Sequence, residues 1–110
     1  MERWLLAAES NCSDPSQEEE FNRWYDETHL PDVLETPGIL RATRYENISA
    51  GEGQGKFLAL YEIETEDIEQ TNTVFGENMA RKLEQGRISE LLVAVSGALY
   101  RQITAPIERK

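Results

Sequence analysis

Apolar residues recur along the chain at spacings that predict four strands and two helices. Residues 4–8 are apolar on both faces, as in a buried strand. Residues 39–45 and 57–63 have the composition of two further strands. Residues 91–103 predict a long last strand, which Gly97 is expected to interrupt.

The first helix is predicted to begin at Pro15. Asp14 precedes it as the cap, proline favours the first helical position, and Gln17 can complete a capping box. The helix is expected to weaken at Pro31 and to end at the Pro-Gly pair of residues 37–38. Its buried stripe, at the i, i+3, i+4, i+7 spacing, consists of Phe21, Trp24, Tyr25 and Thr28.

A second helix is predicted after Thr65, with Glu66 and Asp67 in its first turn and Ile68 on its inward face. Residues 83–89 are expected to form an irregular or short helical connection. The glycine-rich residues 51–55 join the second and third strands, so they predict a mobile hairpin loop. They lack the GxxxxGK[ST] pattern of a phosphate-binding loop.

The predicted order is strand, helix, strand, strand, helix, strand. This is the order of an α+β, ferredoxin-like domain with a four-stranded antiparallel sheet. Residues 1–106 are assigned to this single domain, and residues 107–110 are expected to be a loose tail. Two helices cover one face of four strands, and apolar positions remain for the other face. A symmetric homodimer that buries more than about 2,000 Å² is therefore expected.

The composition narrows the choice of partners. The chain has 110 residues and a formal net charge of -10, from 11 basic and 21 acidic residues. Such a charge repels phosphates and anionic lipid, so neither nucleic acid nor a membrane is expected as a partner. The apolar segments are too short to cross a bilayer and no signal peptide pattern is present, which favours the cytoplasm. One histidine and one cysteine cannot form the usual metal site, so no metal or other cofactor is expected.

His29, the only histidine, is the main candidate for proton chemistry. Tyr25 and Asp26 precede it by four and three residues, so the three side chains can share a flank of the helix. In a catalytic role, His29 would be the general acid or base and Asp26 would hold its imidazole, while a tyrosine hydroxyl binds a developing oxyanion. The alternative is a structural role, in which His29 caps carbonyls at the helix end.

Residues 20–31, with the sequence EFNRWYDETHLP, resemble a segment of the dimeric α+β barrel superfamily. Residues 37–38 and the strand at 41–45 continue the resemblance. It is strongest to the EthD-like branch, where a helix histidine is followed by Pro or Leu-Pro, as His29 is followed by Leu30 and Pro31. Residues 57–62 and 99–103 also resemble this group. The resemblance therefore covers nearly the whole chain.

The resemblance implies a pocket between the first helix and the sheet in each protomer, with two sheets closing a barrel in the dimer. His29 would lie at the pocket mouth. Side chains alternate along strands, so not every tyrosine can point inward, and at most one of Arg41 and Arg44 should reach the pocket. The residues expected to bind the substrate are Trp4, Asn22, Arg41, Tyr45, Tyr61 and Tyr100.

The implied function is a cofactor-independent lyase or isomerase that acts on a small apolar or aromatic substrate by proton transfer at His29. One alternative is a monooxygenase of the same superfamily, either cofactor-free or haem-dependent. Another is a small-molecule-binding or stress-responsive barrel without catalysis. The superfamily includes all these kinds of protein, so its fold does not select among them.

Overall fold

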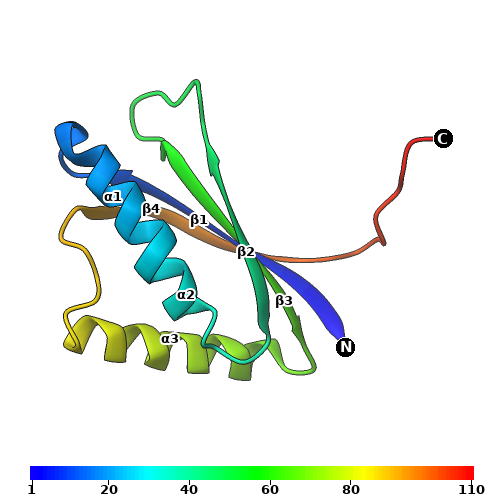
Figure 1. Ribbon diagram of the computed structural model, residues 1–110. Coiled ribbons are helices and arrows are strands. Elements are labelled where there is room, and N and C mark those ends of the chain that lie inside the picture. Colours follow the sequence, from blue (N-terminus) through cyan, green and yellow to red (C-terminus); the bar gives the residue numbers. More distant parts are fainter.

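The computed structural model describes residues 1–110 as a four-stranded antiparallel sheet with all helices on one face (Figure 1). The sheet order is β2-β3-β1-β4. Its strands are β1 (Glu2–Cys12), β2 (Ile39–Glu46), β3 (Phe57–Thr65) and β4 (Leu92–Arg101). The α-helices are α1 (Glu18–Trp24), α2 (Leu30–Val33) and α3 (Ile68–Glu84). The predicted ferredoxin-like order of strands and helices is confirmed.

The core lies between β3 and the first helix. Alternate residues of β3 are buried against the helices, namely Phe57, Ala59, Tyr61 and Ile63. Phe21 and Tyr25 of the first helical segment pack on this row, with their ring centroids 5.7 Å apart. The period of two in β3 and the apolar stripe on the helix therefore meet as the sequence predicts.

The first helical segment is continuous but changes its geometry along its length. Asp14 caps a single 3-10 turn (Pro15–Gln17), where its Oδ1 accepts a hydrogen bond from the Ser16 backbone N–H at 3.0 Å. Next comes α1, then a π-helical turn (Tyr25–His29), then α2. Pro31 is the second residue of α2, two residues after the π-helical turn ends at His29. Because proline has no backbone N–H, a regular helical hydrogen bond is missing there.

Two predictions about the second half of the chain are wrong: where the second helix ends, and that Gly97 interrupts the last strand. The second helix runs to Glu84, so it takes up the start of the expected connection, and Gly86 with φ of 72° ends it. Asp67 precedes that helix as its cap and accepts from the Gln70 N–H at 3.1 Å. Gly97 does not interrupt β4, because it pairs in register with Ala8. The irregularity in β4 lies earlier, at Val95, where the register with β1 shifts between Glu9 and Ser10.

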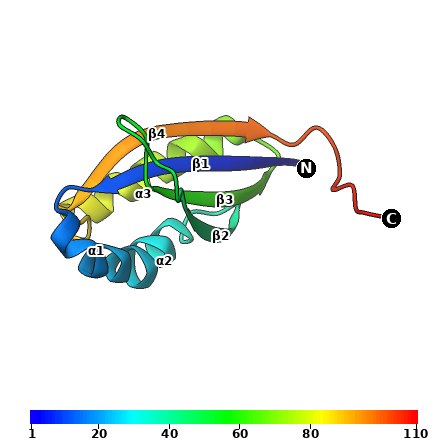
Figure 2. The ribbon, with the colours of Figure 1, turned by 90° about the horizontal axis from the view of Figure 1, so that it is seen from above.

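The other face of the sheet carries no helix (Figure 2). We call it the open face. Strand register places on it the apolar residues Leu5, Ala7, Leu58, Leu60, Ala98 and Tyr100, together with Tyr45. Residues 102–110 continue from β4 away from the body of the molecule (Figure 1). No helix combines the length and hydropathy that a bilayer crossing requires.

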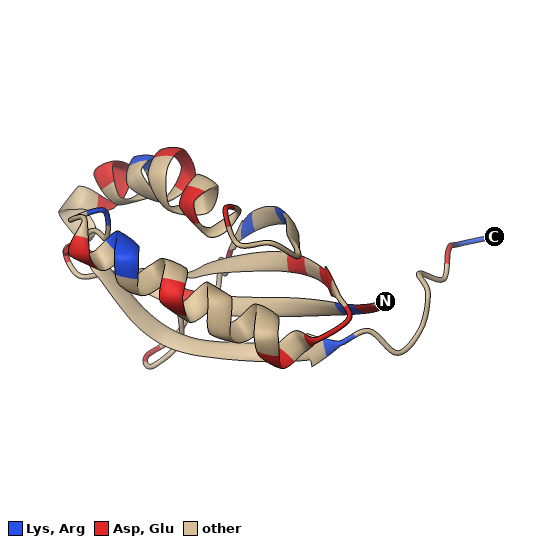
Figure 3. Cartoon of the chain, turned by 90° about the horizontal axis from the view of Figure 1, so that it is seen from below, with Lys and Arg blue, Asp and Glu red and all other residues tan.

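Charged residues are distributed over the helix-covered side. Figure 3 shows acidic residues along α1 and α3, with fewer basic residues between them. Arg23 forms exposed ion pairs within α1, with Glu19 at 3.6 Å and with Glu20 at 2.9 Å. Such pairs contribute little to stability.

Gly76 lies in the middle of α3, and a methyl group at this position would meet no atom within 4 Å. We expect Gly76→Ala to raise the free energy of unfolding by about 1 kcal/mol, because alanine loses less backbone entropy in a helix. Urea denaturation measures the change. Gly38→Ala is the control of opposite sign, because Gly38 has φ of 96° and an alanine there would be strained. An unchanged stability of Gly76→Ala would contradict the prediction.

Candidate functional site

His29 ends the π-helical turn and is 9% exposed. The Trp24 ring stacks on its imidazole with centroids 4.8 Å apart and an interplanar angle of 23°. The Tyr25 ring meets it edge-on, at 4.9 Å and 84°. Two aromatic rings from the same helical segment therefore enclose the imidazole.

Burial determines the charge of this histidine. The pKa of His29 is lowered from 6.5 to about 4, mainly by burial. The Asp32 carboxylate opposes this shift and the Arg44 guanidinium adds to it. His29 is therefore neutral at pH 7. Its Nδ1 is enclosed and has no hydrogen-bond partner. A buried polar atom without a partner costs free energy.

Arg44 of β2 points from the sheet toward the helix. Its Nη1 donates to Asp26 Oδ1 and its Nη2 to Asn22 Oδ1, each at 2.9 Å. Its Cζ lies 4.2 Å from the centroid of the Tyr25 ring, in the geometry of a cation–π interaction. The Arg44 Nε is buried and unpartnered, like His29 Nδ1. Two nitrogen atoms without partners thus lie against the same tyrosine.

Tyr61 of β3 completes what we call the His29 site, which consists of Trp24, Tyr25, His29, Arg44 and Tyr61. The Tyr61 side chain is 2% exposed. Burial raises the pKa of Tyr61 well above its usual value, and the neighbouring Tyr25 raises it further. Tyr61 therefore remains a phenol with an O–H group that can donate.

Asp32, whose carboxylate acts on the imidazole, is buried and forms an ion pair with the partly exposed Arg87. Asp32 is 3% exposed, and Arg87 donates to both of its carboxylate oxygens, from Nε at 2.7 Å and from Nη2 at 3.0 Å. These hydrogen bonds are the main reason why the pKa of Asp32 is lowered. The backbone carbonyl of Arg87 also accepts from Trp24 Nε1 at 2.9 Å.

The structure brings together four of the residues selected from the sequence: Asn22, Tyr25, His29 and Tyr61. Asp26 lies next to them, but its carboxylate pairs with Arg44 and makes no hydrogen bond to His29. The carboxylate that acts on the imidazole is that of Asp32, which sequence reasoning missed. The i+3 spacing from His29 to Asp32 was the available signal.

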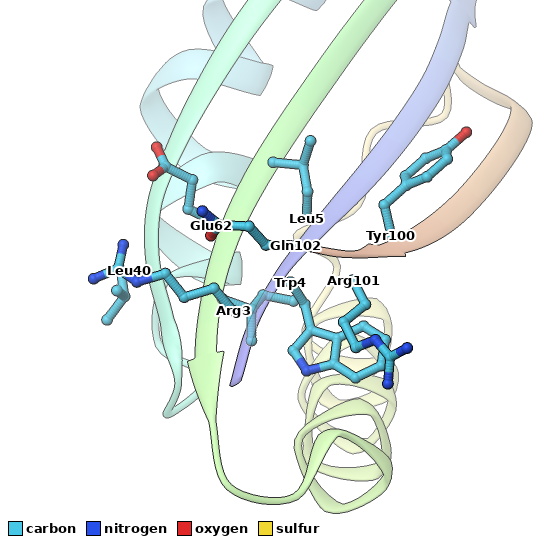
Figure 4. A pocket seen from close by; sticks show the side chains of 9 residues that line it. Arg3, Trp4, Leu5, Leu40, Glu62, Tyr100, Arg101 and Gln102 are labelled. Carbon is cyan, nitrogen blue, oxygen red and sulfur yellow. The ribbon is translucent and has the colours of Figure 1, made fainter. Parts of the chain in front are cut away.

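Four other selected residues lie elsewhere. Arg41 pairs with Glu62 at 2.7 Å on the open face, where Tyr45 and Tyr100 also lie. Trp4 is on the helix-covered face, directed toward α3 (Figure 4). Trp4 and Tyr100 both line a hollow of about 330 Å³ at one end of the sheet. Figure 4 shows these two side chains among the others that line it. The principal cavities of the chain, this one included, are not lined by His29.

Sequence reasoning weighed Arg44 against Arg41 and selected Arg41, which was the wrong one of the two. It missed Trp24 and Arg87 as members or neighbours of the site. Arg44 lies inward because β2 contains an irregularity between Ile39 and Arg41 that shifts the alternation of its side chains. Arg87 follows the second helix in a connection that has no sequence motif. The chain has no group of three or more His, Cys, Asp and Glu side chains that could hold a metal ion.

No family model and no curated protein sequence matches this chain. Solved structures do. HapK from Hahella chejuensis is 13% identical over 97% of this chain and 99% of its own, with a TM-score of 0.68. SnoaB, a cofactor-independent oxygenase from Streptomyces nogalater, is 10% identical over 98% and 100%, with a TM-score of 0.66.

An EthD family protein from Bacillus halodurans is 16% identical over 94% of this chain and 100% of its own, with a TM-score of 0.54. Other structures of this kind are dimeric ferredoxin-like proteins. The expected resemblance to dimeric α+β barrel proteins is therefore confirmed for the fold. At these identities the likeness carries no information about the reaction.

Stability should depend on pH through His29. The unfolded chain binds a proton at this residue near pH 6.5, whereas the folded chain does so only near pH 4. The contribution of the neutral imidazole is therefore complete above pH 6.5 and is lost as the pH falls toward 4, by up to about 3 kcal/mol. We expect urea denaturation to show a smaller loss between pH 7 and 4.5 in His29→Gln than in the wild type. Equal losses would mean that His29 is not buried as described.

Proposed function

We propose that the protein is a cofactor-independent enzyme in which neutral His29 removes a proton from a small aromatic substrate. The observation that carries this proposal is the enclosed, uncharged imidazole beside the Arg44 guanidinium. A general base must be unprotonated at the working pH and within reach of the proton it accepts. The low pKa of His29 meets the first condition at neutral pH.

The neighbours of His29 are suited to the anion that proton removal creates. When the imidazole accepts a proton from a substrate C–H or O–H group, it becomes an imidazolium and leaves an enolate or phenolate oxygen. The Arg44 Nε and the Tyr61 hydroxyl are buried donors that can stabilise this oxygen. The Asp32 carboxylate favours the imidazolium, because it raises the pKa of His29.

The walls of the site favour a flat and largely apolar substrate. Trp24, Tyr25 and Phe21 form a continuous aromatic cluster, with adjacent ring centroids 5.4 to 6.0 Å apart. Aromatic rings pack well on such surfaces. Because the principal cavities do not reach His29, substrate entry requires these side chains to move.

The fate of the anion decides the reaction class. Return of the proton to another carbon gives an isomerase, and loss of a leaving group gives a lyase. Electron transfer from the anion to O₂ gives a cofactor-independent oxygenase, which is the second candidate. SnoaB, a cofactor-independent oxygenase, has the same fold, so the fold is compatible with this candidate. All three reactions begin with the same proton transfer.

We also propose that the open face is covered by a second copy of the chain. Seven apolar or aromatic residues share this face, and Tyr45 and Tyr100 are more than half exposed on it. An uncovered sheet face of this kind indicates an interface. Similar structures are dimeric proteins, which supports a homodimer here.

Light scattering is expected to give twice the chain mass of 12.6 kDa at micromolar concentration. Tyr100→Glu should shift the protein toward monomer, because it would place a charge within the proposed interface. A wild-type protein that is monomeric at this concentration would exclude the sheet-to-sheet dimer.

The catalytic proposal is tested by screening enolisable aromatic compounds for exchange of an acidic proton with solvent deuterium, and for O₂ uptake. His29→Ala should lower turnover by about 10²- to 10⁴-fold without dissociating the dimer. His29→Gln should lose as much, because an amide cannot take up the proton.

The two arginines of β2 provide a matched pair of variants. Arg44→Gln should lower turnover, because it removes the proposed oxyanion donor. Arg41→Gln should not, because Arg41 lies on the other face and pairs with Glu62. Intact turnover in His29→Ala would exclude catalysis by His29 and leave it a structural role in the helix. A ligand that binds near Trp24 without reacting would instead support the binding-protein alternative.

A further inference from the structure

We propose that Arg87 is a positioning residue for His29, because it holds the Trp24 indole over the imidazole and pairs with the Asp32 carboxylate behind it. The functional meaning of this proposal rests on the proposed role of His29. The claim that Arg87 sets the pKa of His29 does not depend on that role, because it concerns the imidazole in the protein without substrate.

Arg87 contacts both neighbours of His29 at once. Its guanidinium makes two hydrogen bonds to Asp32, and its backbone carbonyl accepts the indole N–H of Trp24. Trp24 is the residue that stacks on the imidazole. One residue from the connection after α3 therefore links two residues of the first helical segment on either side of His29.

The turn that carries Arg87 is itself fixed. Gly86 has φ of 72°, and its N–H donates to the Leu83 carbonyl at 3.0 Å. The Arg87 N–H donates to the Lys82 carbonyl at 2.9 Å. These two bonds end α3 in a geometry that returns the chain toward the first helix, so Arg87 starts from a defined backbone position.

The charged groups that act on the imidazole are Asp32 from its own helix and Arg44 from β2. Tyr25 lies edge-on and Trp24 covers the ring. Arg87 balances the charge of Asp32, and without it the carboxylate would favour the imidazolium more strongly. The Arg87 carbonyl that accepts from Trp24 belongs to the backbone and is held by the turn, so loss of the guanidinium acts on His29 through the Asp32 carboxylate. This change raises the pKa of His29.

The test is an NMR titration of the single imidazole in the intact protein without substrate. In Arg87→Met, which keeps an unbranched stem of the side chain without its charge, we expect the His29 midpoint to rise from about 4 toward 6.5, by at least about one unit. Arg87→Lys keeps one ionic contact with Asp32, so its midpoint should lie between those of the wild type and Arg87→Met.

Glu35→Gln is the matched control. Glu35 pairs with Lys82 at 2.9 Å, so this variant breaks another ion pair between α3 and the end of the first helical segment, and the Glu35 side chain makes no hydrogen bond to Trp24 or Asp32. Its His29 midpoint should equal that of the wild type. If the His29 midpoint rose equally in Glu35→Gln and Arg87→Met, the rise would reflect a general loosening of the packing between α3 and the first helical segment. That result would overturn the proposal.

Asp32→Asn separates charge from loosening. It removes the carboxylate that raises the pKa of His29, so the midpoint should stay at or below that of the wild type, whereas loosening would raise it.

An unchanged midpoint in folded Arg87→Met would also overturn the proposal. If Arg87→Met does not fold, Trp24→Phe keeps a stacked ring but lacks the N–H donor, and the absence of any rise in that variant would have the same consequence. Activity lost or kept in His29→Gln bears on catalysis alone.

Discussion

The packing of Tyr25 against β3 determines where the groups of the His29 site lie. The ring is 3% exposed, and three groups meet on it. His29 touches its edge, Arg44 covers its face, and Tyr61 lies close enough for the two phenols to interact. A displacement of this one ring would therefore move the base, the cation and the donor together.

The π-helical turn adds the second wall of the site. In a regular α-helix, residues five apart lie about 140° from each other around the axis, so Trp24 and His29 would not stack. The turn over Tyr25–His29 brings them onto one side while Tyr25 keeps its contact. Such turns are uncommon and often occur at functional sites. The local geometry thus agrees with a functional role for this helix.

The order of elements could be predicted because strand and helix periods are local properties of the sequence. His29 and its contact with Tyr25 could be predicted in the same way, from spacing along one helix. Arg44 could not, since the irregularity at Leu40 reverses which arginine of β2 points inward, and strict alternation from Ile39 favours Arg41. Contacts from a connection such as that of Arg87 depend on tertiary packing, which leaves no pattern in the sequence.

The enclosure of His29 has a consequence for binding strength. The conformation described here is a closed one, and a ligand must select a form in which Trp24 or its neighbours have moved aside. If only a fraction of molecules is open at any time, the apparent dissociation constant is the intrinsic constant divided by that fraction. Under the proposed function, the same walls that keep the imidazole uncharged would therefore weaken the affinity for substrate. Such a protein would exchange tight binding for a base that is unprotonated at neutral pH.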